Sequence, residues 1–509
     1  MRFSLKPRPP VHNRLNQGKE AVRRKVLTEA ARRGILLNPE ALSIIVENCG
    51  ENDFQSLFDK LAGEAKEPGG SVVVSKETVT HVLSSLTGKT EISIGVHPQV
   101  SAKEVEAKVD VLKSYDAKPV SDDLEARKRF FSDRYSKISS ILRSRADMAS
   151  YYPLKKACSL PDRSEGRTIG MIYEKRENYL VVEDPEFTAK IMLPKDGNRE
   201  LKEKINRLIP DSVVGISFHV SNSRLFCRSI IFPDVPLKKP RMADEDISVL
   251  LTSDIHFGSQ KFSEKAFRKM VRWLRNGGVS EREREQAFKI KYIIIAGDLV
   301  DGVGIYPQQE KELQVKDVGK QYDMLADILN QIPDYIKIIA IPGNHDAAPR
   351  AIPQPPIFRD YTRSIEANVS FMSLSNPCMV SLHGVRFLIY HGTSMEDIAT
   401  FAKTASYDRP ENAMEIMLQL RHLAPVYGSR TPLLTQDQDE LVIEEVPDVF
   451  HTGHVHVFRS GSYREIRLVN SGTWQERTKY QEQLGITPTP NIAGILELRN
   501  LSFSEISFA

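Results

Sequence analysis

Short apolar runs separated by longer polar segments fill the second half of the chain. They cover residues 249–251, 292–296, 338–341, 385–390 and 449–450. Runs of this length that are bounded by Gly, Asn and Asp are typical of strands buried on both faces, whereas a buried helix needs about 10 to 12 positions. The pattern therefore predicts an α/β sheet in this half of the chain.

Each apolar run stops at side chains that can bind a metal ion. In chain order these are Asp254 and His256, Asp298 and Asp301, Asn344 and His345, His391, and His454 and His456. One such piece alone is more often a turn, because Asn and Asp favour turns. Binding groups of an α/β sheet, however, gather outside the carboxyl ends of its strands. Five successive runs with this ending predict one shared site.

The residue types in this site indicate which ions it would hold. Carboxylate, amide oxygen and imidazole together suit Mn, Fe, Zn or Ni better than Ca or Mg. Two divalent ions about 3.5–4 Å apart can activate a water and hold a phosphoryl group between them. We predict two divalent ions, Mn²⁺ before Fe, Zn, Ni or Mg. Asp298 is expected to bridge them, with Asp254, His256 and His456 on the first ion and Asn344, His391 and His454 on the second.

These motifs resemble those of the calcineurin-like metallophosphoesterases over residues 245–475. The resemblance implies a two-sheet α/β sandwich with a dinuclear metal site that hydrolyses phosphate esters. It also implies that His345 is no ligand but stabilises the transition state or acts as an acid toward the leaving oxygen. Asp301 matches an acidic residue that orients this histidine, so both are the expected catalytic residues. Capping of a helix or turn is the alternative for Asp301.

The first part of the chain has a different pattern. Apolar positions recur at helical spacing over residues 16–65, and a strand at 72–74 and a capped helix at 75–86 are expected to follow. Residues 1–33 carry ten Lys or Arg and two acidic residues, which suits a phosphate backbone, a solvated helix face or a protein contact. From residue 88 to 119 the pattern fades into Lys, Glu, Pro and Ser, which is typical of a flexible linker.

A third pattern occupies the middle of the chain. An amphipathic helix is expected at 122–145, and a shorter helix at 201–208. Short β-rich runs separated by turn residues cover 168–173, 179–182, 188–193, 213–220 and 225–232. Five strands with a helix after the third fit an OB-fold barrel. Such a barrel can bind single-stranded nucleic acid or serve as a protein interface, and the sequence leaves both open.

Together these patterns predict a multidomain α+β protein. The expected parts are a small helical basic domain at 1–88, a flexible linker at 89–121, a helix with an OB-fold β-barrel at 122–240, and an α/β two-sheet sandwich metallophosphoesterase domain at 241–509. No apolar run approaches the ~18 residues of a membrane span. The four cysteines are scattered without a metal-binding spacing. We therefore expect no membrane contact and a cytoplasmic location.

The order of these parts resembles the small-subunit family of archaeal family D DNA polymerases, which is related to the B subunits of eukaryotic replicative DNA polymerases. The resemblance implies a 3′–5′ exonuclease that hydrolyses DNA phosphodiesters and proofreads. Its implied partners are a large catalytic polymerase subunit, in a heterodimer or heterotetramer, and DNA that is single-stranded or ends in a primer 3′ terminus. Two alternatives stay open. One is another metallophosphoesterase, such as a repair nuclease or a phosphatase, and the other is a non-catalytic scaffold subunit.

Overall fold

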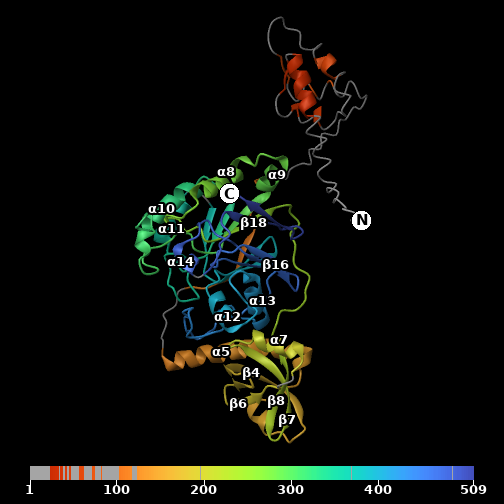
Figure 1. The fold of residues 1–509 in the computed structure, drawn as a ribbon, viewed down its shortest axis with the longest axis vertical. Helices are drawn as coiled ribbons and strands as arrows, with labels where there is room; N and C mark the ends of the chain where they lie inside the picture. The colour runs from red at the N-terminus through yellow and green to blue at the C-terminus, as the bar shows by residue number, and fades with distance from the viewer. Residues whose placement is uncertain are drawn as a thin grey trace, which may run out of the picture. The chain divides into compact units, whose positions relative to one another are not determined.

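The computed structural model describes residues 23–33, 35–37, 41–42, 45–46, 57–61, 72–74, 79, 82, 102–116, 123–194, 197–367, 370–483 and 485–509. The chain divides into two compact units, Met1–Gln99 and Val100–Ala509 (Figure 1). Each unit has a hydrophobic core of its own.

The first unit combines helical segments with a small parallel sheet. A helix covers residues 23–32, and β1 (Ile35–Leu37) pairs with β2 (Val72–Val74). The buried side chains include Val26, Ala30, Ile45, Leu57, Phe58 and Val79. The strand predicted at 72–74 is confirmed. Strand β1 was not expected, because it interrupts a span with helical spacing, and most of the helix expected at 75–86 lies outside the described residues.

The second unit is built on two six-stranded sheets (Figure 1). In spatial order the first sheet contains β12 (Ser370–Ser373), β11 (Lys337–Ala340), β10 (Ile290–Ile295), β9 (Ser248–Thr252), β18 (Ile492–Glu497) and β19 (Phe503–Ser507). The second contains β16 (Arg459–Tyr463), β17 (Ile466–Asn470), β15 (Val449–Thr452), β14 (Val385–Ile389), β13 (Cys378–Leu382) and β3 (Val109–Ser114). Strands β9 to β12 are parallel, as are β14, β15 and β17.

These sheets pack face to face and carry helices on their outer faces. Leu251, Ile294 and Phe387 belong to the core between the sheets, whereas Leu250 and Ile293 pack against helices, because successive strand residues point to opposite faces. The first sheet is covered by α8 (Glu264–Asn276), α9 (Glu281–Lys289), α10 (Val318–Leu329) and α11 (Arg359–Glu366). The second is covered by α12 (Met395–Phe401) and α13 (Pro410–Leu420). Burial on both faces explains the unbroken apolar runs.

Strand β3 lies inside the span expected to be a flexible linker. It pairs antiparallel with β13 at the edge of the second sheet, and the nearby Ala102 is fully buried in the core between the sheets. The expectation of a linker over 89–121 is therefore wrong for residues 102–116. The reason is that an edge strand leaves much of its surface in water, so Val111 and Leu112 stand among polar residues and give a weak signal.

A closed barrel follows β3 in the chain. Its strands are β4 (Glu165–Lys175), β5 (Tyr179–Glu183), β6 (Thr188–Met192), β7 (Val213–Ser221) and β8 (Arg224–Ile231), joined in the order β4-β5-β6-β8-β7. Helix α7 (Arg199–Arg207) lies between β6 and β7. Two short helices, η1 (Ala146–Met148) and α6 (Leu154–Cys158), precede the barrel in the chain. Two others lie outside it: η2 (Gln309–Lys311) follows β10, and α14 (Lys479–Gln483) follows β17. The five strand runs and the helix after the third are present as predicted.

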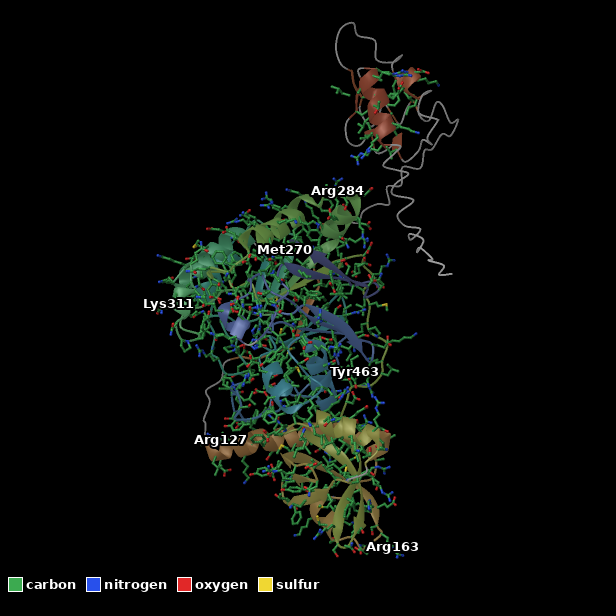
Figure 2. The ribbon with its side chains drawn as sticks, viewed as in Figure 1. Arg127, Arg163, Met270, Arg284, Lys311 and Tyr463 are labelled. Carbon is green, nitrogen blue, oxygen red and sulfur yellow. The ribbon has the colours of Figure 1, made fainter. Side chains whose placement is uncertain are left out.

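Helix α5 (Leu124–Arg143) lies between the barrel and the rest of unit two (Figure 1), and Figure 2 shows Arg127 on it. Its Arg134 is fully buried and donates from Nε to Asp439 Oδ2 at 2.6 Å and from Nη1 to the Pro425 carbonyl at 2.5 Å. The same Asp439 oxygen lies 2.8 Å from His422 Nε2. This buried pair joins α5 to the segment that follows α13.

Among the described residues, no helix is both long enough and apolar enough to cross a membrane.

Replacing Arg134 by Ala should destabilise unit two by about 3–5 kcal/mol, because Asp439 then stays buried without its guanidinium partner. Arg129→Ala is the matched control. Arg129 bonds Asp437 at 2.7 Å, but their side chains are 52% and 77% exposed, and such pairs contribute about 0–1 kcal/mol. Denaturant unfolding followed by tryptophan fluorescence measures both variants. Equal midpoints for Arg134→Ala and Arg129→Ala would show that the buried pair does not hold α5 in place.

Candidate metal centre

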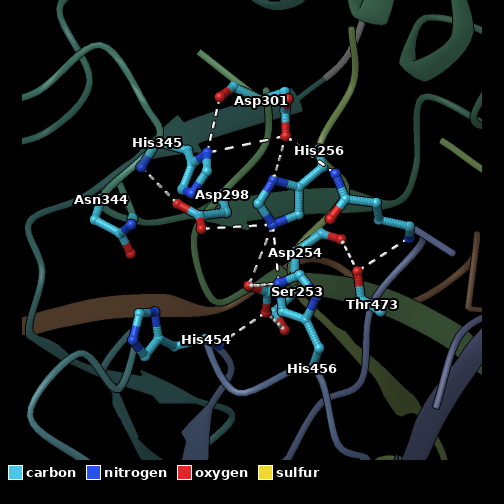
Figure 3. A network of polar contacts seen from close by, with 12 residues as sticks. Ser253, Asp254, His256, Asp298, Asp301, Asn344, His345, His454, His456 and Thr473 are labelled. Atoms are coloured by element: carbon cyan, nitrogen blue, oxygen red, sulfur yellow. Dashed lines mark hydrogen bonds and ion pairs between the residues drawn. The ribbon is translucent and has the colours of Figure 1, made fainter. Parts of the chain in front are cut away.

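The candidate residues all follow the carboxyl ends of strands at the junction of the two sheets. Asp254 and His256 follow β9, Asp298 and Asp301 follow β10, and Asn344 and His345 follow β11. His391 follows β14, and His454 and His456 follow β15. The first three strands belong to one sheet and the last two to the other. Because both sheets end here, ligands from all five segments meet. Figure 3 shows the side chains that follow β9, β10, β11 and β15.

One group of side chains surrounds the carboxylate of Asp254. The Nε2 atoms of His256 and His456 lie 3.8 Å and 3.4 Å from Asp254 Oδ1, and 3.0 Å from each other. All three side chains are buried. Their donor atoms therefore point at one small region, as the first ion's predicted ligands should.

Asp298 connects this group to a second one. Its Oδ2 atom lies 3.6 Å from His256 Nε2 and 3.3 Å from His391 Nε2. His391 Nε2 is also 3.1 Å from Asn344 Oδ1. One carboxylate oxygen thus faces imidazoles of both groups, which is the position expected of a bridging ligand.

His454 stands at the outer side of the second group. Its ring centroid is 5.1 Å from that of His391, and its Nε2 atom is 3.8 Å from Glu396 Oε1. Its main-chain N–H donates to Asp254 Oδ2 at 2.9 Å, so the turn that carries His454 also holds Asp254. The structure therefore brings together all seven predicted ligands.

The backbone of these turns is held in an uncommon conformation. Five of the seven candidate ligands have positive φ angles, namely Asp254, His256, Asp298, His454 and His456. This region costs non-glycine residues about 1–3 kcal/mol each, and residues that adopt it often cluster at functional sites. At Gly343, a Cβ would overlap the Asp298 carboxylate, so glycine lets the two loops approach. The strained backbone conformation directs the ligand side chains toward the centre of the cluster.

Hydrogen bonds behind the ligands fix which ring nitrogen faces the centre. His391 Nδ1 donates to the Ala296 carbonyl at 2.7 Å, and His256 Nδ1 donates to Asp301 Oδ1 at 2.9 Å. With Nδ1 engaged in this way, Nε2 is the ring nitrogen of His256 and His391 that faces the carboxylates. Outer partners of this kind orient the ligands of metal sites and raise their basicity.

The contacts of Asp301 differ from the predicted dyad. The resemblance led us to expect its carboxylate on His345, but that carboxylate bonds His256, and the His345 Nδ1–Asp301 Oδ1 distance is 3.9 Å. His345 Nδ1 donates instead to the main-chain carbonyl of Asp301 at 2.8 Å. Residue 301 therefore orients His345 as expected, but through its backbone. A carbonyl orients a ring without adding a full charge.

The donor set fits a metal ion. Asp254 Oδ1 is buried and accepts no hydrogen bond of good geometry from any described residue. Burial opposes its charge, yet the imidazoles of His256 and His456 hold the pKa of Asp254 well below its usual value. Burial likewise opposes the charge of Asp298, and His391 and His345 lower its pKa. Both carboxylates therefore stay ionised at neutral pH, and they attract positive charge to this point.

Several supporting residues had not been singled out in the sequence. Gln475 Nε2 donates to Asp301 Oδ1 at 3.1 Å, and Gln481 Nε2 lies 2.7 Å from His456 Nδ1. Thr473 Oγ1 donates to the Asp254 carbonyl at 2.9 Å. These residues follow β17 (Ile466–Asn470), in which Arg467 interrupts the apolar pattern. The segment after it contains no histidine or aspartate, so it does not look like a ligand set.

Asp346 is a further brace that the sequence did not reveal. Its carboxylate accepts hydrogen bonds from the main-chain N–H groups of Leu299 and Gly343 and from the Tyr322 hydroxyl. Burial, together with the nearby Asp298 charge, raises the pKa of Asp346 to about 6. The residue ties the turn after β10 to the turn after β11, and thus Asp298 to Asn344.

A cavity of about 440 Å³ opens onto the centre. Its walls include His345, Asn344, His454 and Glu396. Another cavity of about 480 Å³ lies between β3 and residues 438–445, and its lining contains none of the candidate ligands. Only the first of these two spaces offers a substrate access to the ligand cluster.

Known proteins resemble this chain in sequence. A family model for the DNA polymerase alpha/epsilon B subunit matches residues 249–459, a span that includes every candidate ligand. The chain is 36% identical to the DNA polymerase II small subunit of Archaeoglobus fulgidus, over 91% of this chain and 93% of that protein. It is 35% identical to the protein of the same name from Methanothermobacter thermautotrophicus, over 95% of this chain and 100% of that protein.

A third relative, the DNA polymerase II small subunit of Pyrococcus horikoshii, is 36% identical over 87% of this chain and 76% of that protein. These similarities extend over nearly the full length of the chain, so they include the barrel as well as the ligand cluster. They confirm the resemblance that the order of motifs indicated. The chain belongs to the archaeal DNA polymerase II small-subunit family.

Proposed function

We propose that this chain is a metal-dependent 3′–5′ exodeoxyribonuclease that hydrolyses DNA phosphodiesters and proofreads for the large polymerase subunit that the name of its family implies. The observation that supports this most is the buried cluster around Asp254 and Asp298, in which one carboxylate faces imidazoles of both groups. A scaffold subunit would have no use for strained turns that hold two ionised carboxylates together.

Two divalent ions, with Mn²⁺ as first choice, are proposed to occupy this cluster. Asp254, His256 and His456 would hold one, Asn344, His391 and His454 the other, and Asp298 both. When bound, such ions lower the pKa of water to near neutrality and neutralise the charge of a phosphoryl group. The remaining work falls to the side chains of the cavity.

His345 is proposed as the residue that acts on the leaving oxygen. It lines the cavity, and its ring centroid is 4.6 Å from that of His256. Its Nδ1 proton is engaged by the Asp301 carbonyl, so Nε2 is the atom that can donate to a substrate. Burial lowers the pKa of His345, and a lower pKa makes its protonated form a stronger acid.

The other parts of the chain are assigned as follows. We propose that the two sheets form a calcineurin-like phosphoesterase sandwich and that the closed barrel is an OB-fold, since five strands close with a helix after the third. We further propose that residues 1–88 form a small basic domain and that DNA, single-stranded or at a primer 3′ end, is the substrate. In this domain map, residues 102–116 belong to the sandwich.

Asp298→Ala should abolish metal-dependent hydrolysis, because both groups lose the oxygen that they share. The measurement is release of nucleotides from end-labelled single-stranded DNA with and without Mn²⁺. Asp317→Ala is a control, since Asp317 is a helix N-cap that bonds the Lys320 N–H and lies outside the cavity. Full activity of Asp298→Ala, with the control unchanged, would refute the assignment.

His345→Ala should keep both ions and bind DNA as the wild type does, but cleave it roughly 10²–10⁴-fold more slowly, the usual contribution of general acid catalysis. His454→Ala should instead lose an ion. Metal analysis of the purified variants, together with single-turnover rates, separates the two outcomes. Loss of an ion from His345→Ala as readily as from His454→Ala would make His345 a ligand.

A further inference from the structure

The cavity at the metal centre also has lining residues that the proposed chemistry does not use. Beside the ligands and several polar side chains, an apolar wall is made of Ile305, Tyr306, Pro307, Tyr407, Val455 and Ile486. These residues come from the segments that follow β10, α12, β15 and α14. A hydrolytic site for an isolated phosphate group would have no need of such a wall, because phosphate offers only oxygen atoms.

Tyr306 lies beside the proposed acid. Its ring centroid is 6.4 Å from that of His345, and its hydroxyl donates to Glu312 Oε2 at 3.1 Å. The hydroxyl bond restrains the ring, and the ring is half-buried. A restrained ring can stack on a ligand with little further loss of side-chain entropy.

Tyr407 and Ile486 form another part of the same wall. Both are half-buried and pack against the core that contains Met414 and Leu418 of α13. Their side chains are therefore supported by the hydrophobic core. Tyr407 lies in the long segment between His391 and His454.

We propose that this wall is a subsite for the nucleobase of the nucleotide whose phosphate lies at the metal centre. The inference rests on the proposed function and specifies how the substrate is held. Aromatic and aliphatic side chains stack on the π-face that every base has, and they do so without reading its edge. The cavity volume of about 440 Å³ lies within the range of pockets that enclose a small organic ligand. The polar wall takes the phosphate, and the apolar wall takes the base.

The test compares two ligands that differ only in the base. The affinities of 2′-deoxyadenosine 5′-monophosphate and 2-deoxyribose 5-phosphate for the full chain in Mn²⁺ are measured by calorimetry. The wild type should bind the nucleotide about 5- to 150-fold more tightly, which is the usual effect of stacking one base. Tyr306→Leu and Tyr407→Leu should each lower this ratio and leave the affinity for the sugar phosphate unchanged.

Two further variants make the result specific. Tyr306→Phe keeps the ring and should keep most of the ratio, although it loses the bond to Glu312. Tyr173→Leu replaces a barrel tyrosine that is 66% exposed and outside the cavity lining, and it should change nothing. Unfolding midpoints equal to that of the wild type show that the variants are folded.

The subsite is refuted if the wild type binds both ligands equally, or if neither leucine variant changes the ratio. Failure of the proposed nuclease has a separate signature. In that case the wild type releases no nucleotide from end-labelled DNA, while the calorimetric ratio and its loss in the leucine variants still support base binding.

Discussion

Two carboxylates, Asp254 and Asp298, lie buried where the carboxyl ends of two sheets meet. Ionised groups in such a place are costly unless positive charge or hydrogen-bond donors surround them. The imidazoles, the turn amides and, in the proposed enzyme, two cations meet this requirement. The positive φ angles and the close approach at Gly343 follow from it, because donors must reach the carboxylates from five different strand ends. The site is thus a consequence of how the two sheets are joined.

The burial of the strands that lead to the site explains why the site could be located in the sequence. A strand covered on both faces is a continuous apolar run, so the residue after it is identified as a strand end without knowledge of the fold. His256, Asp298 and His391 could be found in this way. The histidines at 383 and 422 lack that context, whereas His451 directly follows the fifth run and was ambiguous in the sequence. In the structure His422 bonds Asp439, and His451 lies inside β15 and bonds Ser471. Position relative to the strand, more than residue type, separates ligands from structural histidines.

What the sequence could not show depends on contacts between distant segments. The side-chain amides of Gln475 and Gln481 contact Asp301 and His456, and an amide carries no pattern that reveals its partner. The sequence also does not show whether Asp301 contacts His345 through its carboxylate or through its carbonyl, because a backbone rotation within one turn decides between them. Strand β3 was missed for another reason: it lies at a sheet edge and its side chains are half-buried or exposed, so its composition resembles that of a linker.

The position of β3 has a consequence for how the chain assembles. The chain enters the sandwich at β3, leaves it to build α5 and the barrel, and returns at β9, so the barrel is an insertion held at both ends. Tyr115 and Ser375, which bond each other beside β3, are 260 positions apart. During synthesis β3 emerges before the barrel, while its partner β13 emerges long after it. The closing of this sheet edge is therefore a late step, and the barrel has time to fold as a unit before the sandwich is complete.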